Sequence, residues 1–127
     1  MPQLKLEYTD NIIQDTDFDS LFLKIHQILF NTGGINIENC KSRAVKIQNY
    51  FIGQGDANNA FIHLQIQFLE GRSDSLKQAI GHQILNLLKE YYKASLENLN
   101  LQITVEITDI QKKTYFKIPE GSLFSDK

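Results

Sequence analysis

The chain has 127 residues, of which 42% are hydrophobic, and this size and composition are typical of one globular domain with its own core. The net charge of −2 lacks the basic excess that nucleic-acid or membrane-surface binding favours, and no apolar run approaches the roughly 20 residues of a membrane-spanning helix. The single cysteine excludes an internal disulfide, and the N-terminus has no signal-peptide pattern, so we expect a cytoplasmic protein with no nucleic-acid or membrane partner.

The first half of the chain predicts a strand, a helix and a strand. These elements cover residues 2–8, 16–34 and 41–51. Alternation in the first strand places Pro2 on the apolar face with Leu4 and Leu6. Thr16 or Asp17 is expected to cap the helix, whose apolar stripe recurs every three or four residues, and Gly33-Gly34 to end it.

The second half repeats this pattern after a glycine- and asparagine-rich loop. Its predicted strand, helix and strand cover residues 60–69, 73–96 and 98–110. Ser73 or Asp74 is the expected helix cap. The tail, residues 111–127, mixes aromatic residues with proline and glycine, and it fits either a short strand or an arm on a neighbouring subunit.

The element order β-α-β-β-α-β predicts an α+β fold, with a four-stranded sheet and two helices on one face. We expect a single domain over residues 1–127, built from two β-α-β halves at about 1–56 and 57–127. The second sheet face is then open. Its expected residues are Ala44, His63, Gln65, Gln67, Thr104 and Glu106. Such a face is either solvated or covered by further copies of the chain in a closed oligomer.

Pro2 is the first candidate for chemistry. If Met1 is removed, Pro2 carries a free secondary amine, and α-amino groups have reference pKa values of about 7.7–8.0. Burial and a nearby cation would lower this value toward that of an effective base at neutral pH. From these residues alone, a strand-edge proline without a role is the favoured explanation, because the missing N–H costs least at a strand's first residue and prolines are common at the second position.

Three cations could accompany this amine. Lys41 and Arg43 are two residues apart on a predicted strand and so share a face. Arg72 precedes the second helix, where free backbone N–H groups would add to its planar fork in binding an anion. Together they could hold a substrate with several carboxylates, although each alone is also typical of an ordinary turn or solvated strand edge.

The other reactive residues give weaker signals. The three histidines share no metal-ligand spacing, and a structural role is expected for each: His26, His63 and His82. Cys40 lies in no motif, and Gly53-Gln54-Gly55 lacks the third glycine and the following helix of a phosphate-binding loop. We therefore expect neither a metal site nor a nucleophile triad.

Four segments together resemble the 5-carboxymethyl-2-hydroxymuconate Δ-isomerases of the tautomerase superfamily. They are MPQLKLEYTDNI, KSRAVKI, AFIHLQIQFLEGRS and VEITDIQKKTYFK, and the resemblance runs from Met1 to about Lys117. It implies a homotrimer of the MIF-like type in which Pro2 is the catalytic base. It also implies that the substrate carboxylates are bound by Arg72 and by Lys41 and Arg43 of the KSR segment. It also implies transfer of a proton from the 2-hydroxyl of a dienol tricarboxylate to carbon 5, without cofactor or metal, in homoprotocatechuate breakdown.

Two features qualify what the resemblance implies. The family often has arginine at the position of Lys41, and lysine keeps the charge but loses the bidentate fork. A retained Met1 would make the nitrogen of Pro2 a non-basic amide.

The alternatives to this isomerase function are a keto-enol tautomerase of the same superfamily and a non-enzymatic trimeric ligand-binding protein. A ferredoxin-like nucleic-acid binder is disfavoured by the acidic isoelectric point of about 5.9.

Overall fold

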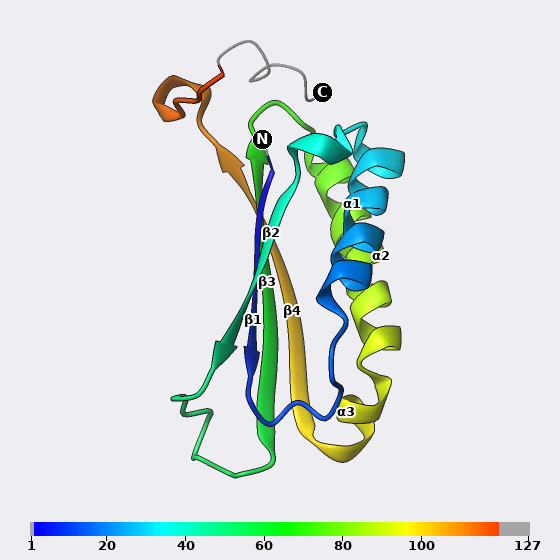
Figure 1. The fold of residues 1–127 in the computed structure, drawn as a ribbon, viewed down its shortest axis with the longest axis vertical. Coiled ribbons are helices and arrows are strands. Elements are labelled where there is room, and N and C mark those ends of the chain that lie inside the picture. Colours follow the sequence, from blue (N-terminus) through cyan, green and yellow to red (C-terminus); the bar gives the residue numbers. More distant parts are fainter. Residues whose placement is uncertain (1, 120–127) are drawn as a thin grey trace.

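The computed structural model describes residues 2–119, which form one sheet flanked by helices (Figure 1). Its elements in chain order are β1 (Gln3–Thr9), α1 (Phe18–Gly33), η1 (Ile37–Asn39), β2 (Lys41–Ile47), β3 (Asn59–Leu69), α2 (Asp74–Tyr91), α3 (Lys93–Asn98), β4 (Asn100–Ile110) and η2 (Lys112–Thr114). The elements η1 and η2 are short 3₁₀ helices. None of the described helices combines the length and the apolar character needed to cross a membrane.

The sheet has the strand order β2-β1-β3-β4. Strands β1 and β2 are parallel, as are β3 and β4, while β1 and β3 are antiparallel. Helices α1 and α2 cover the same face, and the other face is left open (Figure 1). The predicted β-α-β-β-α-β fold is confirmed.

Local sequence sets the ends of both long helices. The Oδ1 atom of Asp17 accepts a hydrogen bond from the backbone N–H of Ser20, at 3.2 Å, and caps α1. Gly34 ends this helix with a φ of 67°, which glycine adopts without strain. At the start of α2, the hydroxyl of Ser73 accepts from the N–H of Leu76, also at 3.2 Å. Of the candidate caps, Asp17 and Ser73 are thus the ones used.

The core lies between the helices and the sheet face that they cover. Strands β1 and β3 and both long helices supply the fully buried aliphatic side chains: Leu4, Leu6, Leu21, Ile25, Leu29, Ile62, Leu64, Ile66, Ile80, Ile84 and Leu88. Phe68 is fully buried at the end of β3. Even-numbered residues of β1 and β3 therefore face the helices, and odd-numbered ones face the open side.

Strand β2 differs from its prediction in length and in the orientation of one residue. It ends at Ile47 instead of residue 51, because its partner β1 ends at Thr9 opposite Ile47. Ala44 lies opposite Leu6 and faces the helices, so its expected place on the open face is wrong. Val45 takes that place, opposite Glu7, and is 37% exposed.

The second long helix is also interrupted, since α2 ends at Tyr91 and α3 begins at Lys93. The residue between them, Tyr92, has φ −100° and ψ 26°, outside the helical region. Its side chain is buried, and its hydroxyl lies 3.0 Å from that of Thr16. The single predicted helix over residues 73–96 is therefore two helices, with the break where Tyr92 enters the core.

Tyr92 is expected to make the fold sensitive to alkaline pH. Burial raises the pKa of this phenol from its ordinary value of 10.0 to about 12. Above pH 10 the unfolded chain loses this proton while the folded chain keeps it, so the free energy of unfolding falls by up to about 1.4 kcal/mol per pH unit until about pH 12. Urea unfolding at pH 9, 10 and 11 measures this slope. The Tyr92→Phe variant should lack this part of the slope, and an equally steep loss in that variant would assign it to other groups.

Candidate active site

Pro2 is buried where β1 begins, and strand alternation places it on the helix-covered face with Leu4. Its carbonyl oxygen accepts a hydrogen bond from the backbone N–H of Lys41 at 3.1 Å. Gln3 pairs with Lys41 and with Gln67, so Pro2, one position earlier, falls between the strand positions of Cys40 and Phe68. A free amine at Pro2 would therefore lie in a largely apolar setting.

Arg72 belongs to the turn between β3 and α2, and this turn lies at the end of the sheet where β1 begins (Figure 1). Its guanidinium carbon is 4.9 Å from the centre of the Phe68 ring, which is within cation–π range. Its Nη1 atom donates to the backbone carbonyl of Leu69 at 3.2 Å. Pro2 and Arg72 thus both lie beside Phe68, one through strand register and the other through ring contact.

Lys41 and Arg43 share a face, as expected from their spacing, but it is the open face. Their register partners are Gln3 and Lys5. The Nζ atom of Lys41 donates to the carbonyl of Asn39 at 3.1 Å. Both terminal nitrogens of Arg43 donate to Oε1 of Gln3, Nη1 at 2.9 Å and Nη2 at 2.7 Å. Within one protomer, Arg43 is therefore directed away from the face on which Pro2 lies.

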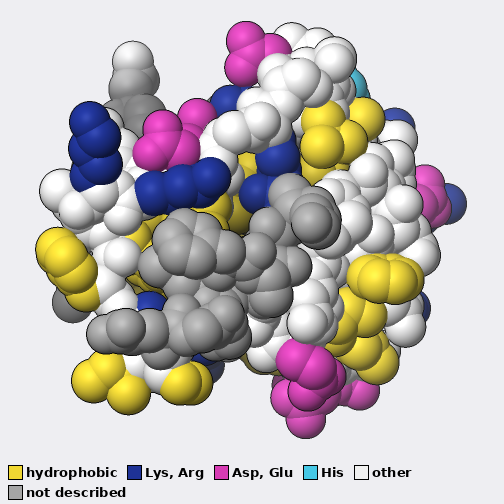
Figure 2. All heavy atoms as spheres, turned by 90° about the horizontal axis from the view of Figure 1, so that it is seen from above, with side chains coloured by type: hydrophobic (Ala, Val, Ile, Leu, Met, Phe, Trp, Pro, Cys, Tyr) yellow, Lys and Arg dark blue, Asp and Glu magenta, His cyan; other side chains and the backbone are white. Residues whose placement is uncertain are grey.

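Lys and Arg side chains also lie at this end of the molecule, with Asp and Glu side chains beside them. Figure 2, which views the molecule from this end, shows several of them on its surface. Three residues of this region were not singled out by sequence reasoning: Gln3, Phe68 and Tyr115. Gln3 has an odd number on β1, so strand alternation alone could have placed it on the same face as Lys41 and Arg43. No sequence signal links Tyr115 to Gln3.

Two of the histidines have hydrogen-bond partners, and the third lies on the surface. Nε2 of His26 lies 2.7 Å from the hydroxyl of Ser42, and burial lowers the pKa of His26. On the open face, Nδ1 of His63 lies 2.7 Å from the Thr104 hydroxyl. His82 is exposed on α2. Within residues 2–119, no three His, Cys, Asp or Glu side chains are grouped so that they could hold a metal ion.

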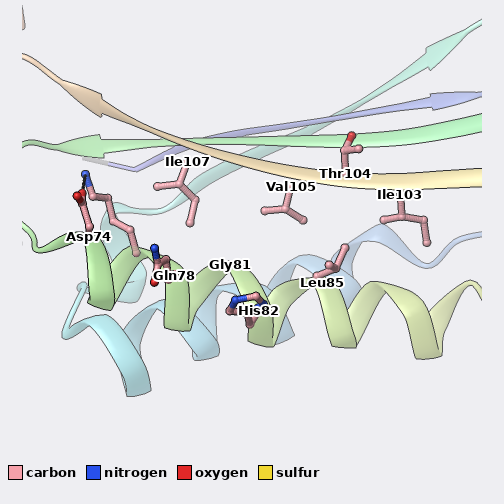
Figure 3. Close-up of a pocket in the computed structure, with 10 residues that line it drawn as sticks. Asp74, Gln78, Gly81, His82, Leu85, Ile103, Thr104, Val105 and Ile107 are labelled. Atoms are coloured by element: carbon pink, nitrogen blue, oxygen red, sulfur yellow. Dashed lines mark ion pairs between the residues drawn. The ribbon is translucent and has the colours of Figure 1, made fainter.

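Elsewhere on the molecule, a groove of about 560 Å³ runs between α2 and β4 (Figure 3). Its β4 wall is mainly apolar, with Ile103, Val105 and Ile107 beside Thr104. The amine of Lys77, which lines the groove, lies 3.4 Å from Asp74 and 3.2 Å from Asp109, and the hydrogen bond to Asp109 raises its pKa. This groove contains neither Pro2 nor the three predicted cations, so we do not assign the chemistry to it.

The fold and the kind of reaction follow from comparison with known proteins. The structure superposes on a protein described as the "Q0 fused 4-OT wild type symmetric trimer" with a TM-score of 0.72, 13% identity, and 91% coverage of each chain. It also superposes on a 5-carboxymethyl-2-hydroxymuconate isomerase from Deinococcus radiodurans R1 with a TM-score of 0.83, 26% identity, and coverage of 91% of this chain and 87% of that one. The protein is an isomerase with the tautomerase fold.

Sequence comparison narrows this class to one family. A sequence model of the family described as 5-carboxymethyl-2-hydroxymuconate isomerase matches residues 2–120. The 5-carboxymethyl-2-hydroxymuconate Delta-isomerase of Escherichia coli is 27% identical over 117 residues, which are 92% of this chain and 93% of that protein. The chain belongs to the 5-carboxymethyl-2-hydroxymuconate isomerase family.

Proposed function

We propose that the protein converts the dienol 5-carboxymethyl-2-hydroxymuconate to its 2-oxo isomer, with the N-terminal amine of Pro2 as the base. The observation that carries this proposal is the burial of Pro2 at the end of the sheet where the Arg72 guanidinium lies over the Phe68 ring. An apolar setting and a nearby cation both disfavour protonation of an amine, so the nitrogen would be available as a base near neutral pH. Membership of the isomerase family supports the same reaction.

The reaction needs one group that first accepts and then donates a proton. The Pro2 nitrogen takes the proton of the 2-hydroxyl, and the oxygen electron pair forms the 2-oxo group. The two conjugated double bonds become a single one between carbons 3 and 4, and carbon 5 takes the proton back from Pro2. No electrons are gained or lost overall, so the balanced step requires no redox partner.

Two cations would hold and polarise the carboxylates. Arg72 offers a planar fork that binds a carboxylate through two hydrogen bonds. Lys41 is assigned to a second carboxylate because it is the first residue of the edge strand β2, where its N–H holds the Pro2 carbonyl. Its side chain begins on the open face, so its flexible stem has to turn around the strand end to make this contact. Arg43, turned onto the other sheet face by Gln3, receives no substrate contact within the protomer.

The assembly and setting are part of the same proposal. We infer a homotrimer in which open sheet faces pack together, which the symmetric trimer of a structural neighbour supports. The reaction would belong to homoprotocatechuate breakdown, as the family's substrate suggests. A cytoplasmic location agrees with the single cysteine.

Intact mass and a pH–rate profile test the proposal together. We expect a mass short by one methionine, and a kcat/KM that rises with pH and then levels off as one group loses its proton. The midpoint should lie below the reference value of about 7.7–8.0, because burial and the cation lower the pKa of the amine. Full activity in protein that retains Met1 would contradict the proposal.

A substrate panel separates the two alternatives. A general keto-enol tautomerase would convert a simple enol with one carboxylate and leave the tricarboxylate unchanged. A ligand-binding protein would bind the tricarboxylate without turnover, and binding would be unaffected by Pro2→Ala. The position of Lys41, where a lysine replaces the planar fork of arginine, is the reason to test the first alternative.

A further inference from the structure

A second groove, of about 510 Å³, lies between α1 and β2, and no step of the proposed reaction uses it. Its volume is within the roughly 300–1,000 Å³ of sites for small molecules. Ser42 of β2 lines this groove, and its register partner Leu4 is buried under the helices. The groove therefore lies on the helix-covered side of the sheet, with Pro2, and is not part of the open face that packs in the proposed trimer.

One end of this groove adjoins the Pro2 site. Lys41 and Cys40 line it. The backbone N–H of Lys41 donates to the carbonyl of Pro2, and Cys40 has the strand position next to Pro2. With strands about 4.8 Å apart and a rise of about 3.3 Å per residue, the Cα atoms of Ser42 and Pro2 are roughly 8 Å apart. A substrate whose reacting atom lies at the Pro2 nitrogen could therefore extend to Ser42.

Ser42 and His26 form a hydrogen-bonded pair in the groove. Nε2 of His26 lies 2.7 Å from the Ser42 hydroxyl, and both side chains are half-buried. Burial lowers the pKa of His26, so its imidazole is neutral near pH 7. A neutral imidazole that carries its proton on Nε2 donates to the Ser42 oxygen and leaves the hydroxyl proton free for a ligand carboxylate.

The charges that line the groove favour an anion at the Ser42 end. Lys41 directly precedes Ser42 and brings a cation to this end. Asp19 also lines the groove, but it lies seven residues before His26 on α1, about 10 Å along the helix axis. A carboxylate bound by Ser42 would thus lie near the positive charge and away from the negative one.

The substrate of the proposed reaction has three carboxylates, and Arg72 and Lys41 are assigned to two of them. The third belongs to the carboxymethyl group, and its carbon is two bonds from carbon 5, the atom that receives the proton from Pro2. On the basis of the proposed function, we propose that Ser42 and His26 bind this third carboxylate. The pair then selects the tricarboxylate over muconates that have no carboxymethyl group.

Calorimetric titration with two inert ligands tests this pair without requiring turnover. Pentane-1,2,5-tricarboxylate is the saturated skeleton of the substrate without its hydroxyl, and adipate is the same skeleton without the carboxymethyl group. We expect the parent protein to bind the tricarboxylate about tenfold or more tightly than adipate, since a hydrogen bond to a charged group commonly contributes that much. Ser42→Ala and His26→Gln should each reduce this preference to about twofold and leave the affinity for adipate within about twofold. Absence of a preference in the parent protein overturns the proposal.

Matched variants separate a ligand contact from a structural role. Ser42→Thr keeps the hydroxyl and should keep the preference, as should His82→Gln, which removes an exposed imidazole from α2. Thermal unfolding checks each variant, and either substitution in the pair is a sufficient test if the other does not fold. An equal loss for both ligands in the folded variants, or a preserved preference, would overturn the proposal.

Turnover of the dienol is measured on the same preparations. A preference that depends on Ser42 in a parent protein without turnover would refute the Pro2 mechanism and keep this carboxylate site. Turnover without the preference would refute the site and keep the mechanism.

Discussion

Replacement of Pro2 by alanine is expected to lower kcat by about 10²–10⁴-fold, the usual contribution of a positioned acid–base group. The alanine amine would be primary and free to rotate, whereas the proline ring fixes the direction of the nitrogen. The fold should survive, because the hydrogen bond to Lys41 uses the backbone carbonyl at position 2. Steady-state kinetics with the tricarboxylate dienol measure the loss, and thermal unfolding checks the fold.

A second variant isolates the basicity of the nitrogen. Insertion of leucine between Met1 and Pro2 prevents removal of the methionine and keeps the proline ring, but converts its nitrogen to an amide. We expect a loss at least as large as that of Pro2→Ala. If the insertion variant turned over the dienol at the normal rate, the nitrogen could not be the base.

The repeated pattern of strand, helix and strand was readable from the sequence because it depends on local periodicity. Strands β1 and β3 alternate apolar and polar residues, so each side chain is assigned to a face by counting. Helix ends were similarly local, since Asp17 and Ser73 each bond a backbone N–H three residues ahead. The burial of Pro2 followed from the same alternation.

Strand β2 could not be assigned in the same way. Its sequence KSRAVKI offers a small residue, Ala44, on one face and Val45 on the other, so hydrophobicity does not decide which face is covered. Only pairing with β1 settles the question. That pairing also turns Arg43 toward Gln3, which is why three cations predicted for one site are divided between two sheet faces.

Contacts between distant residues were also beyond sequence reasoning. Arg72 and Pro2 are 70 positions apart, and the antiparallel register of β1 and β3 brings them to one end of the sheet. The bond from Gln3 to Tyr115 joins residues 112 positions apart, in a tail with no regular periodicity. The break at Tyr92 arises in the same way, since its hydroxyl contacts Thr16 from the other half of the chain.

Truncation of Phe68 to alanine is expected to destabilise the fold by about 3–5 kcal/mol, as removal of a fully buried aromatic ring does. Total stabilities of such domains are about 5–15 kcal/mol, so the variant should remain folded only at low temperature or low denaturant. The ring packs into the core that both helices cover, and its loss leaves a cavity there. Urea unfolding of the variant and the parent protein measures the difference.

Phe61→Ala is the matched control, because Phe61 lies on the same strand but on the open face, where it is half-buried. Its loss should cost clearly less than that of Phe68. Phe68→Leu fills most of the space and should cost about 1.5 kcal/mol or less, while removing the ring under Arg72. If that ring positions the guanidinium for a carboxylate, Phe68→Leu should raise KM even though it costs little stability. Phe61→Ala should leave KM unchanged. An unchanged KM in Phe68→Leu would mean that the Phe68 ring is not needed to hold Arg72 in place.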